Sequence, residues 1–84
     1  MSDNKINVNF ATSISDEEVS DIFDYHPWDD DKIEAGKKIR EALGYAYKVI
    51  VENAPCGPDR TTALRKVREA RMDANSAITH DGKY

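Results

Sequence analysis

The stretch from Lys32 to Asn53, KIEAGKKIREALGYAYKVIVEN, decides the fold of this chain. Its apolar residues recur at intervals of three and four, which is the repeat of one face of an α-helix. They are Ile39, Leu43, Ala46, Val49 and Ile50. The spacing predicts a long amphipathic helix over 32–53, capped by one of Asp29, Asp30 and Asp31, with Asp31 and Glu34 as a possible capping box.

A turn and a second long helix follow. Residues 53–58, NAPCGP, hold two prolines and a glycine, which cannot continue a helix, and Asp59 can cap what comes next. Over 60–79 the apolar residues again repeat at three and four: Leu64, Val67, Ala70, Ala74 and Ile78. This stripe is rich in alanine, which favours close packing on another helix. Two such helices joined by a short turn form an antiparallel helical hairpin.

The region before the hairpin contains one short helix. Ser15-Asp16-Glu17-Glu18 has the pattern of a capping box and predicts a helix over 16–23, which Pro27 keeps from continuing. Further upstream, Ile6, Val8 and Phe10 alternate with polar residues, so this segment is either a short extended arm or unstructured. The predicted fold is all-α, with an N-terminal arm and short helix over 1–24 and a helical-hairpin domain over 25–84.

The length of the chain predicts self-association. A chain of 84 residues forms one small core, which barely offsets the loss of chain entropy. Cys56 is alone, and His26 and His80 stand far apart in the sequence without a cysteine pair, so we expect no disulfide, metal or other cofactor. A hairpin cannot cover both of its apolar faces, and we expect oligomers to cover the surface left by Tyr45, Tyr47 and Val51.

The composition and charge of the chain limit where the protein can be located and which partners it can bind. The chain has neither a signal-peptide pattern nor a run of about 18 apolar residues, so we expect a cytoplasmic protein without membrane contact. The net charge of −4 hides an asymmetry, because residues 1–31 hold nine acidic residues and one basic residue. An anionic ligand would therefore meet residues 32–84, but the acidic first third and a pI near 5.0 oppose DNA or RNA binding.

The sequence offers binding groups and lacks a pattern typical of catalysis. Cys56 has no histidine near it in the sequence, and we expect no catalytic role for it. Asp29-Asp30-Asp31 is read more simply as a helix N-terminus than as a divalent-cation site. Tyr25 and Trp28 could stack on a purine, although for Trp28 we favour a role in covering the end of the hairpin core.

Basic residues gather on the last helix. They are Arg60, Arg65, Lys66, Arg68 and Arg71. Such a stretch is either a solvated helix face or a surface that recognises phosphate through guanidinium groups. The composition leaves both readings open.

Taken together, these motifs resemble the phage anti-CBASS cyclic-nucleotide sponges, which share a helical-hairpin domain with an anti-Thoeris sponge. The resemblance runs from Phe23 to His80. It rests on Phe23-x-Tyr25-His26-Pro27, on Ile39-Arg40, on the Pro/Gly turn, and on DRTTALRKVREARMxANSAI over 59–78. It implies a non-catalytic, all-α homohexamer in the host cytoplasm that sequesters cyclic oligonucleotides and so blocks activation of the CBASS effector.

The resemblance also implies a set of binding residues. In that family, cyclic dinucleotides such as cGAMP sit in pockets shared by two protomers, with an aromatic ring on a base and a basic residue near a phosphate. The positions carried over are Tyr25, His26, Pro27, Lys37, Arg40, Arg60, Thr61 and His80. The family often has an arginine after the Ala-Ile run, where this chain has Thr79-His80, and neutral imidazole binds phosphate less well than guanidinium. Cyclic dinucleotides are therefore favoured over cyclic trinucleotides. The alternative is a small helical hairpin that docks on a partner protein.

Overall fold

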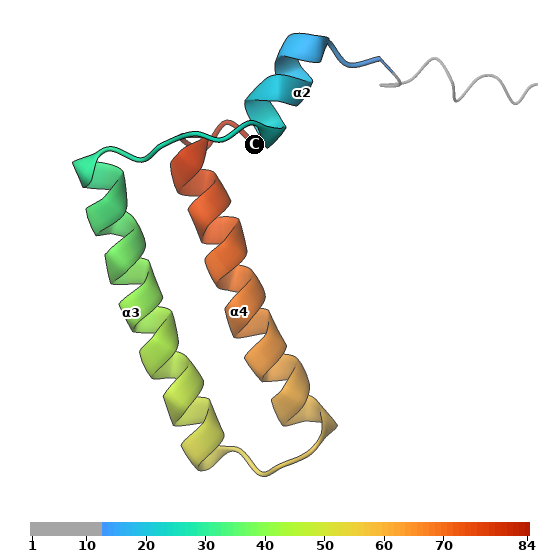
Figure 1. Ribbon diagram of the computed structural model, residues 1–84. Coiled ribbons are helices and arrows are strands. Elements are labelled where there is room, and N and C mark those ends of the chain that lie inside the picture. The colour runs from blue at the N-terminus through green and yellow to red at the C-terminus, as the bar shows by residue number, and fades with distance from the viewer. Residues whose placement is uncertain (1–12) are drawn as a thin grey trace, which may run out of the picture.

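The computed structural model describes residues 13–84, and this part of the chain is helical (Figure 1). Its elements are α2 (Asp16–Phe23), α3 (Asp30–Asn53) and α4 (Pro58–Thr79). Residues 13–84 contain no β-strand. The predicted all-α class is confirmed, whereas the expectation for Ile6, Val8 and Phe10 falls outside the described residues. None of the three helices is long and apolar enough to cross a membrane.

The short helix α2 begins and ends where the sequence predicts. The Ser15 hydroxyl accepts a hydrogen bond of 3.1 Å from the backbone N–H of Glu18, which is one half of the predicted capping box. Asp16, Glu17 and Glu18 place negative charge in the first turn, where it complements the helix dipole. Local sequence signals alone thus define α2.

Both long helices begin two residues before their predicted starts, and two predicted caps are wrong. Asp29 caps α3 by accepting a hydrogen bond of 2.9 Å from the backbone N–H of Lys32, so the capping box starting at Asp31 does not form. Gly57 takes the N-cap position of α4 and makes no side-chain cap, so Asp59 does not cap that helix. Pro58 can start α4 because its fixed φ suits the first helical turn and its missing N–H is not needed there.

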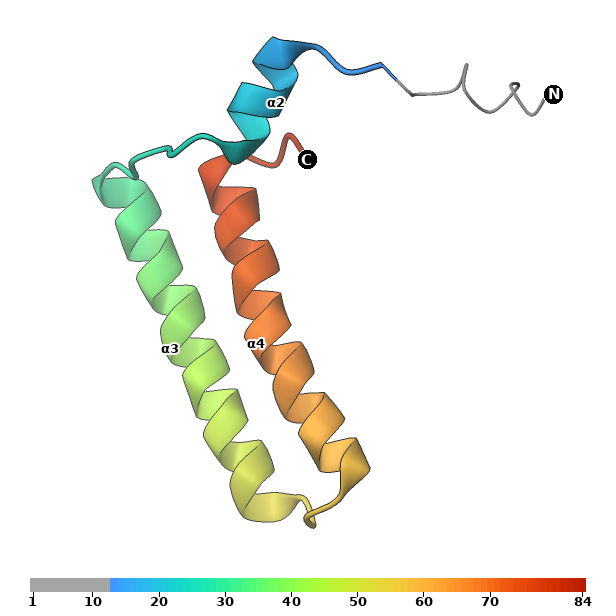
Figure 2. The same cartoon turned by 45° about the vertical axis from the view of Figure 1, so that its right-hand side comes forward.

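The helices α3 and α4 contact each other and run antiparallel, side by side in both views (Figures 1 and 2). Residues 54–57 connect them at one end. At the other end, residues 24–29 pass from α2 to the start of α3, and α2 lies near the C-terminal end of α4. One end of the molecule thus gathers α2, the linker over 24–29 and the end of α4.

The end of α4 turns the C-terminal tail back toward α2. The backbone N–H of Gly82 donates to the carbonyl of Ala77 at 2.9 Å, and that of Asp81 donates to Ile78 at 3.3 Å. This is a Schellman motif, with Asp81 in the left-handed conformation at φ 54°. Lys83 and Tyr84 then reach Asp21 of α2 with hydrogen bonds of 3.0 and 2.7 Å. The tail therefore ties α2 to the rest of the chain.

The described residues, 13–84, enclose no apolar core within one chain. Among residues 13–84 only Gly36 is buried, and no apolar side chain is. The radius of gyration is 18.7 Å, whereas a compact chain of this length has about 12 Å. Large apolar side chains are exposed on all three helices, among them Phe23 of α2 at 79%, Tyr45 of α3 at 71% and Met72 of α4 at 63%.

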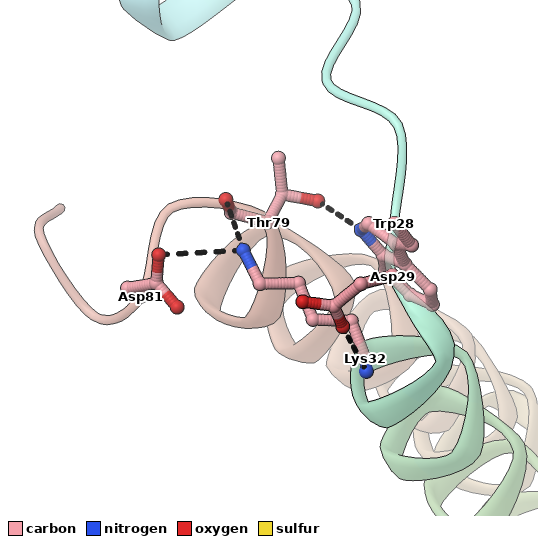
Figure 3. Close-up of polar contacts among 5 residues, drawn as sticks. All are labelled: Trp28, Asp29, Lys32, Thr79 and Asp81. Carbon is pink, nitrogen blue, oxygen red and sulfur yellow. Dashed lines mark hydrogen bonds and ion pairs between the residues drawn. The ribbon is translucent and has the colours of Figure 1, made fainter.

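The best-packed contact is made by Trp28, where the linker meets α3 (Figure 3). A Cβ at position 36 would overlap Cζ3 of the Trp28 ring and lie 2.8 Å from Cη2, so the ring packs directly on the glycine backbone. The indole N–H donates a hydrogen bond of 2.8 Å to the hydroxyl of Thr79 on α4. Trp28 therefore covers the end of the α3–α4 pair, as the sequence predicts.

We expect Gly36→Ala to destabilise the protein by about 1–3 kcal/mol, because the new methyl group overlaps the Trp28 ring. Gly44→Ala on the same helix is the matched control. No atom lies within 4 Å of a Cβ at that position, and alanine should stabilise the helix there by about 0.5–1 kcal/mol. Urea denaturation followed by circular dichroism measures both. Equal stabilisation by the two substitutions would show that Trp28 does not require the glycine.

Candidate functional site

The predicted ligand-binding residues lie in three separate places. Four are at the end of the molecule that holds the linker over 24–29 and the C-terminal end of α4, two are in the first half of α3, and two are at the start of α4. In that order they are Tyr25, His26, Pro27 and His80; Lys37 and Arg40; and Arg60 and Thr61. Arg40 lies about 15 Å along α3 from its first residue. A single copy of the chain therefore does not bring the eight residues together.

Tyr25 stands on the linker with its side chain open to solvent. Asp24 ends α2, and Pro27 holds the preceding residue away from the helical conformation, so the linker is extended. Tyr25 is 87% exposed. It has the free ring face that stacking on a base requires.

The hollow beside Tyr25 is acidic. It is shallow and lined by residues of α2 and the linker: Asp16, Glu17, Ser20, Asp21, Asp24, Tyr25 and His26. Four carboxylates repel a phosphate, and the lining contains no lysine or arginine to oppose them. A nucleotide stacked on Tyr25 needs its phosphate-binding cations from elsewhere.

His26 and His80, which stand far apart in the sequence, are neighbours in the fold. Their ring centroids are 5.2 Å apart in an edge-to-face arrangement, although 54 positions separate them in the sequence. His26 also contacts the backbone of α2, where its Nε2 donates to the carbonyl of Asp21 at 2.7 Å. Both rings are half-buried and face intramolecular partners.

Asp21 is a charged group close to both histidines. Its Oδ2 accepts hydrogen bonds from the Tyr84 hydroxyl and the Lys83 ammonium, and these lower the pKa of the Asp21 carboxyl. The same contacts raise the pKa of Lys83 and of Tyr84. Asp21 is therefore a carboxylate at neutral pH.

A mostly apolar groove, to which both helices contribute arginine residues, runs between α3 and α4 at mid-length. We call it the arginine groove, and its lining residues are Arg40, Leu43, Gly44, Tyr47, Val67, Arg68 and Arg71. A second hollow continues it toward the start of α4 and shares Tyr47 and Arg68 with it; Thr61, Leu64 and Arg65 complete that lining. No acidic residue lines either hollow. Lys37 precedes Arg40 by three residues and so lies beside it on the surface of α3.

The arginine groove combines a mostly apolar lining with residues of a type that binds phosphate. Guanidinium groups bind phosphate oxygens through paired hydrogen bonds, and they come here from both helices. Leu43, Gly44 and Val67 provide an apolar floor, and Tyr47 an aromatic ring. The sequence placed Arg68 and Arg71 in a basic stretch but did not single them out. The sequence shows that Arg68 and Arg71 are three positions apart and so lie close together on one helix. That both lie opposite Arg40 depends on how α3 and α4 are aligned along each other, which the sequence does not show.

Arg60 serves the connection between α3 and α4. Its Nη1 donates to the Ala54 carbonyl at 3.4 Å and lies 3.0 Å from the sulfur of Cys56. The Thr61 hydroxyl donates to the Gly57 carbonyl at 3.2 Å. These contacts hold Arg60 in the turn, away from Tyr25.

Comparison with protein-family models, with curated proteins and with solved structures found no match to this chain. The resemblance to the anti-CBASS sponges therefore stays a hypothesis that rests on the quoted motifs.

We expect Arg60→Ala to lower the free energy of unfolding by about 0.5–1 kcal/mol, since the turn loses the hydrogen bond to Ala54. Arg65→Ala is the control, because Arg65 is an exposed residue of the same helix and should change stability by less than about 0.5 kcal/mol. Urea denaturation gives both values. Equal effects of the two substitutions would contradict a structural role for Arg60.

Proposed function

We propose that this protein sequesters cyclic oligonucleotide second messengers, cyclic dinucleotides above all, in pockets between copies of itself and without cleaving them. The arginine groove is the observation that carries the proposal. It combines guanidinium groups from two helices with an apolar floor, which suits a ligand that has phosphates and bases together. The motif resemblance supplies the ligand class.

A pocket between two copies would bring together binding groups that lie far apart within one copy. Tyr25 has a free ring but stands beside carboxylates, whereas the arginine groove has cations and lies farther along α3. If Tyr25 of one copy stacks on a base whose phosphate lies in the arginine groove of another, each copy contributes the group that the other lacks there. Arg40 and Lys37 would then bind the phosphate, which is the role that the resemblance implies for basic residues of the first long helix.

Association of copies also supplies the missing core. Exposed apolar side chains on several helices, among them Phe23, Tyr45 and Met72, lose contact with water when copies of the hairpin pack together. The resemblance implies a homohexamer, and we propose that state for this chain. In the host cytoplasm it would bind the cyclic nucleotide and so keep it from activating the CBASS effector.

We expect a cyclic dinucleotide such as cGAMP to raise the melting temperature by mass action. Tyr25→Ala should weaken binding by about 1–3 kcal/mol, or roughly 5- to 150-fold, while Tyr25→Phe keeps the stacking surface and most of the affinity. Arg68→Ala should also weaken binding, whereas Lys66→Ala, at an exposed position of α4 outside both hollows, should not. Isothermal titration calorimetry measures these affinities.

The fate of the ligand tests the proposed sequestration. Nucleotide released by heating the complex should elute unchanged in chromatography. A cleaved product would contradict the proposal, as would equal affinities of Tyr25→Ala, Arg68→Ala and the unaltered protein.

We expect Tyr45→Glu to dissociate the oligomer and lower its melting temperature, because a charge replaces an apolar contact at the interface between copies. Lys48→Gln, one turn along the same helix at an exposed position, lowers the net charge by the same one unit and is the matched control. Size-exclusion chromatography with light scattering reads the mass of each. A monomeric unaltered protein would count against the proposed hexamer.

The same exposed apolar side chains support a second candidate, a helical hairpin that docks on a different protein. That function predicts a monomer or dimer in isolation, no thermal shift with any cyclic nucleotide, and partner affinity that is lost on substitution of Tyr45 or Val51. The two experiments above separate it from the sponge.

A further inference from the structure

Three potential metal ligands meet where the linker crosses the end of α4. They are Asp21 from the last turn of α2, His26 from the linker and His80 from the end of α4, and one ligand atom from each lies within 4.8 Å of the others. All three residues are half-buried. Donors from three separate segments thus converge on one small volume.

The hydrogen bonding of His26 fits a ligand role. A carbonyl oxygen only accepts, so the bond of 2.7 Å to Asp21 requires the proton on Nε2 and leaves a lone pair on Nδ1. Histidines that bind metals commonly donate their other ring nitrogen to a carbonyl or a carboxylate, which fixes the tautomer and the ring orientation. His26 already has such a partner in this structure.

Asp21 contributes the negative charge. Lys83 and Tyr84 both contact its Oδ2, and within the described residues no hydrogen bond engages Oδ1. One oxygen of this carboxylate lies within 4.8 Å of a ring nitrogen of each histidine. The Lys83 ammonium is the opposing feature, since its positive charge competes with a cation for the same carboxylate.

We propose that Asp21, His26 and His80 form a binding site for a divalent transition-metal ion of the zinc class. Two imidazoles and one carboxylate suit zinc and its neighbours, whereas calcium and magnesium require mainly oxygen ligands. In a tetrahedral site with bonds of about 2.1 Å, ligand atoms are about 3.4 Å apart. The half-buried side chains have to close by about 1 Å, and the open fourth position takes water or an anion.

A metal here ties α2 and the linker to the end of α4. It acts as a staple in a protomer that has no buried apolar side chain among its described residues. Binding should therefore raise the melting temperature with increasing metal concentration. The inference does not depend on the proposed nucleotide function, because it concerns the protein without nucleotide.

The test is a titration of the nucleotide-free full chain with zinc chloride, followed by calorimetry. The expected result is one ion per chain, with at least about tenfold weaker binding by His80→Asn and by Asp21→Asn. Cys56→Ser, at the opposite end of α3 and α4, should bind zinc as the unaltered chain does. Lys83→Ala should bind about fivefold more tightly, because it removes the competing charge.

Nuclear magnetic resonance of the imidazole nitrogens in the unaltered protein tests the site even if a variant fails to fold. Zinc should shift the ring-nitrogen signals of both His26 and His80. The proposal is overturned if neither signal shifts, or if His80→Asn folds and binds zinc with unchanged affinity. Loss of binding in Cys56→Ser with retention in His80→Asn would overturn it as well, by placing the ion at the thiol.

Discussion

The packing of Trp28 on Gly36 is the contact on which this end of the molecule depends. The indole ring needs a position on α3 without a side chain, and its N–H needs an acceptor on α4, which Thr79 provides. Lys32 adds a hydrogen bond of 3.3 Å to the Thr79 carbonyl and an ion pair with Asp81 (Figure 3). A single aromatic residue therefore joins the linker to both long helices and fixes their ends relative to each other.

The positions of the neighbouring groups follow from that contact. With Trp28 held against α3 and bonded to α4, the preceding residues must cross the end of α4, and His26 arrives beside His80. The Schellman motif then turns the tail back so that Lys83 and Tyr84 meet Asp21. The helix α2 is therefore held by the linker and the tail. Among the described residues, the only helix-to-helix packing is that of α3 on α4.

The features that local interactions control could be predicted from the sequence. Apolar spacing and the Ser15 cap defined three helices to within two residues at each end, and Trp28 was expected to cover the end of the hairpin core. The errors arose where two signals competed, since Asp29 and Asp31 are equally good capping residues by type, and Pro58 started α4 without help from Asp59. The meeting of His26 with His80 and of Arg40 with Arg68 depends on the register of α3 against α4, which no local pattern encodes.

The lack of an enclosed core in one protomer links the proposed function to assembly. A chain of this size cannot surround a dinucleotide, but two copies can face each other across one, each contributing the groups that the other lacks. Under the proposed function, the surface that binds ligand adjoins the surface that joins the copies. Ligand would then stabilise the oligomer, and the oligomer would complete the binding site. Such a protein removes ligand in proportion to its own concentration. Affinity and abundance, rather than turnover, then set its effect.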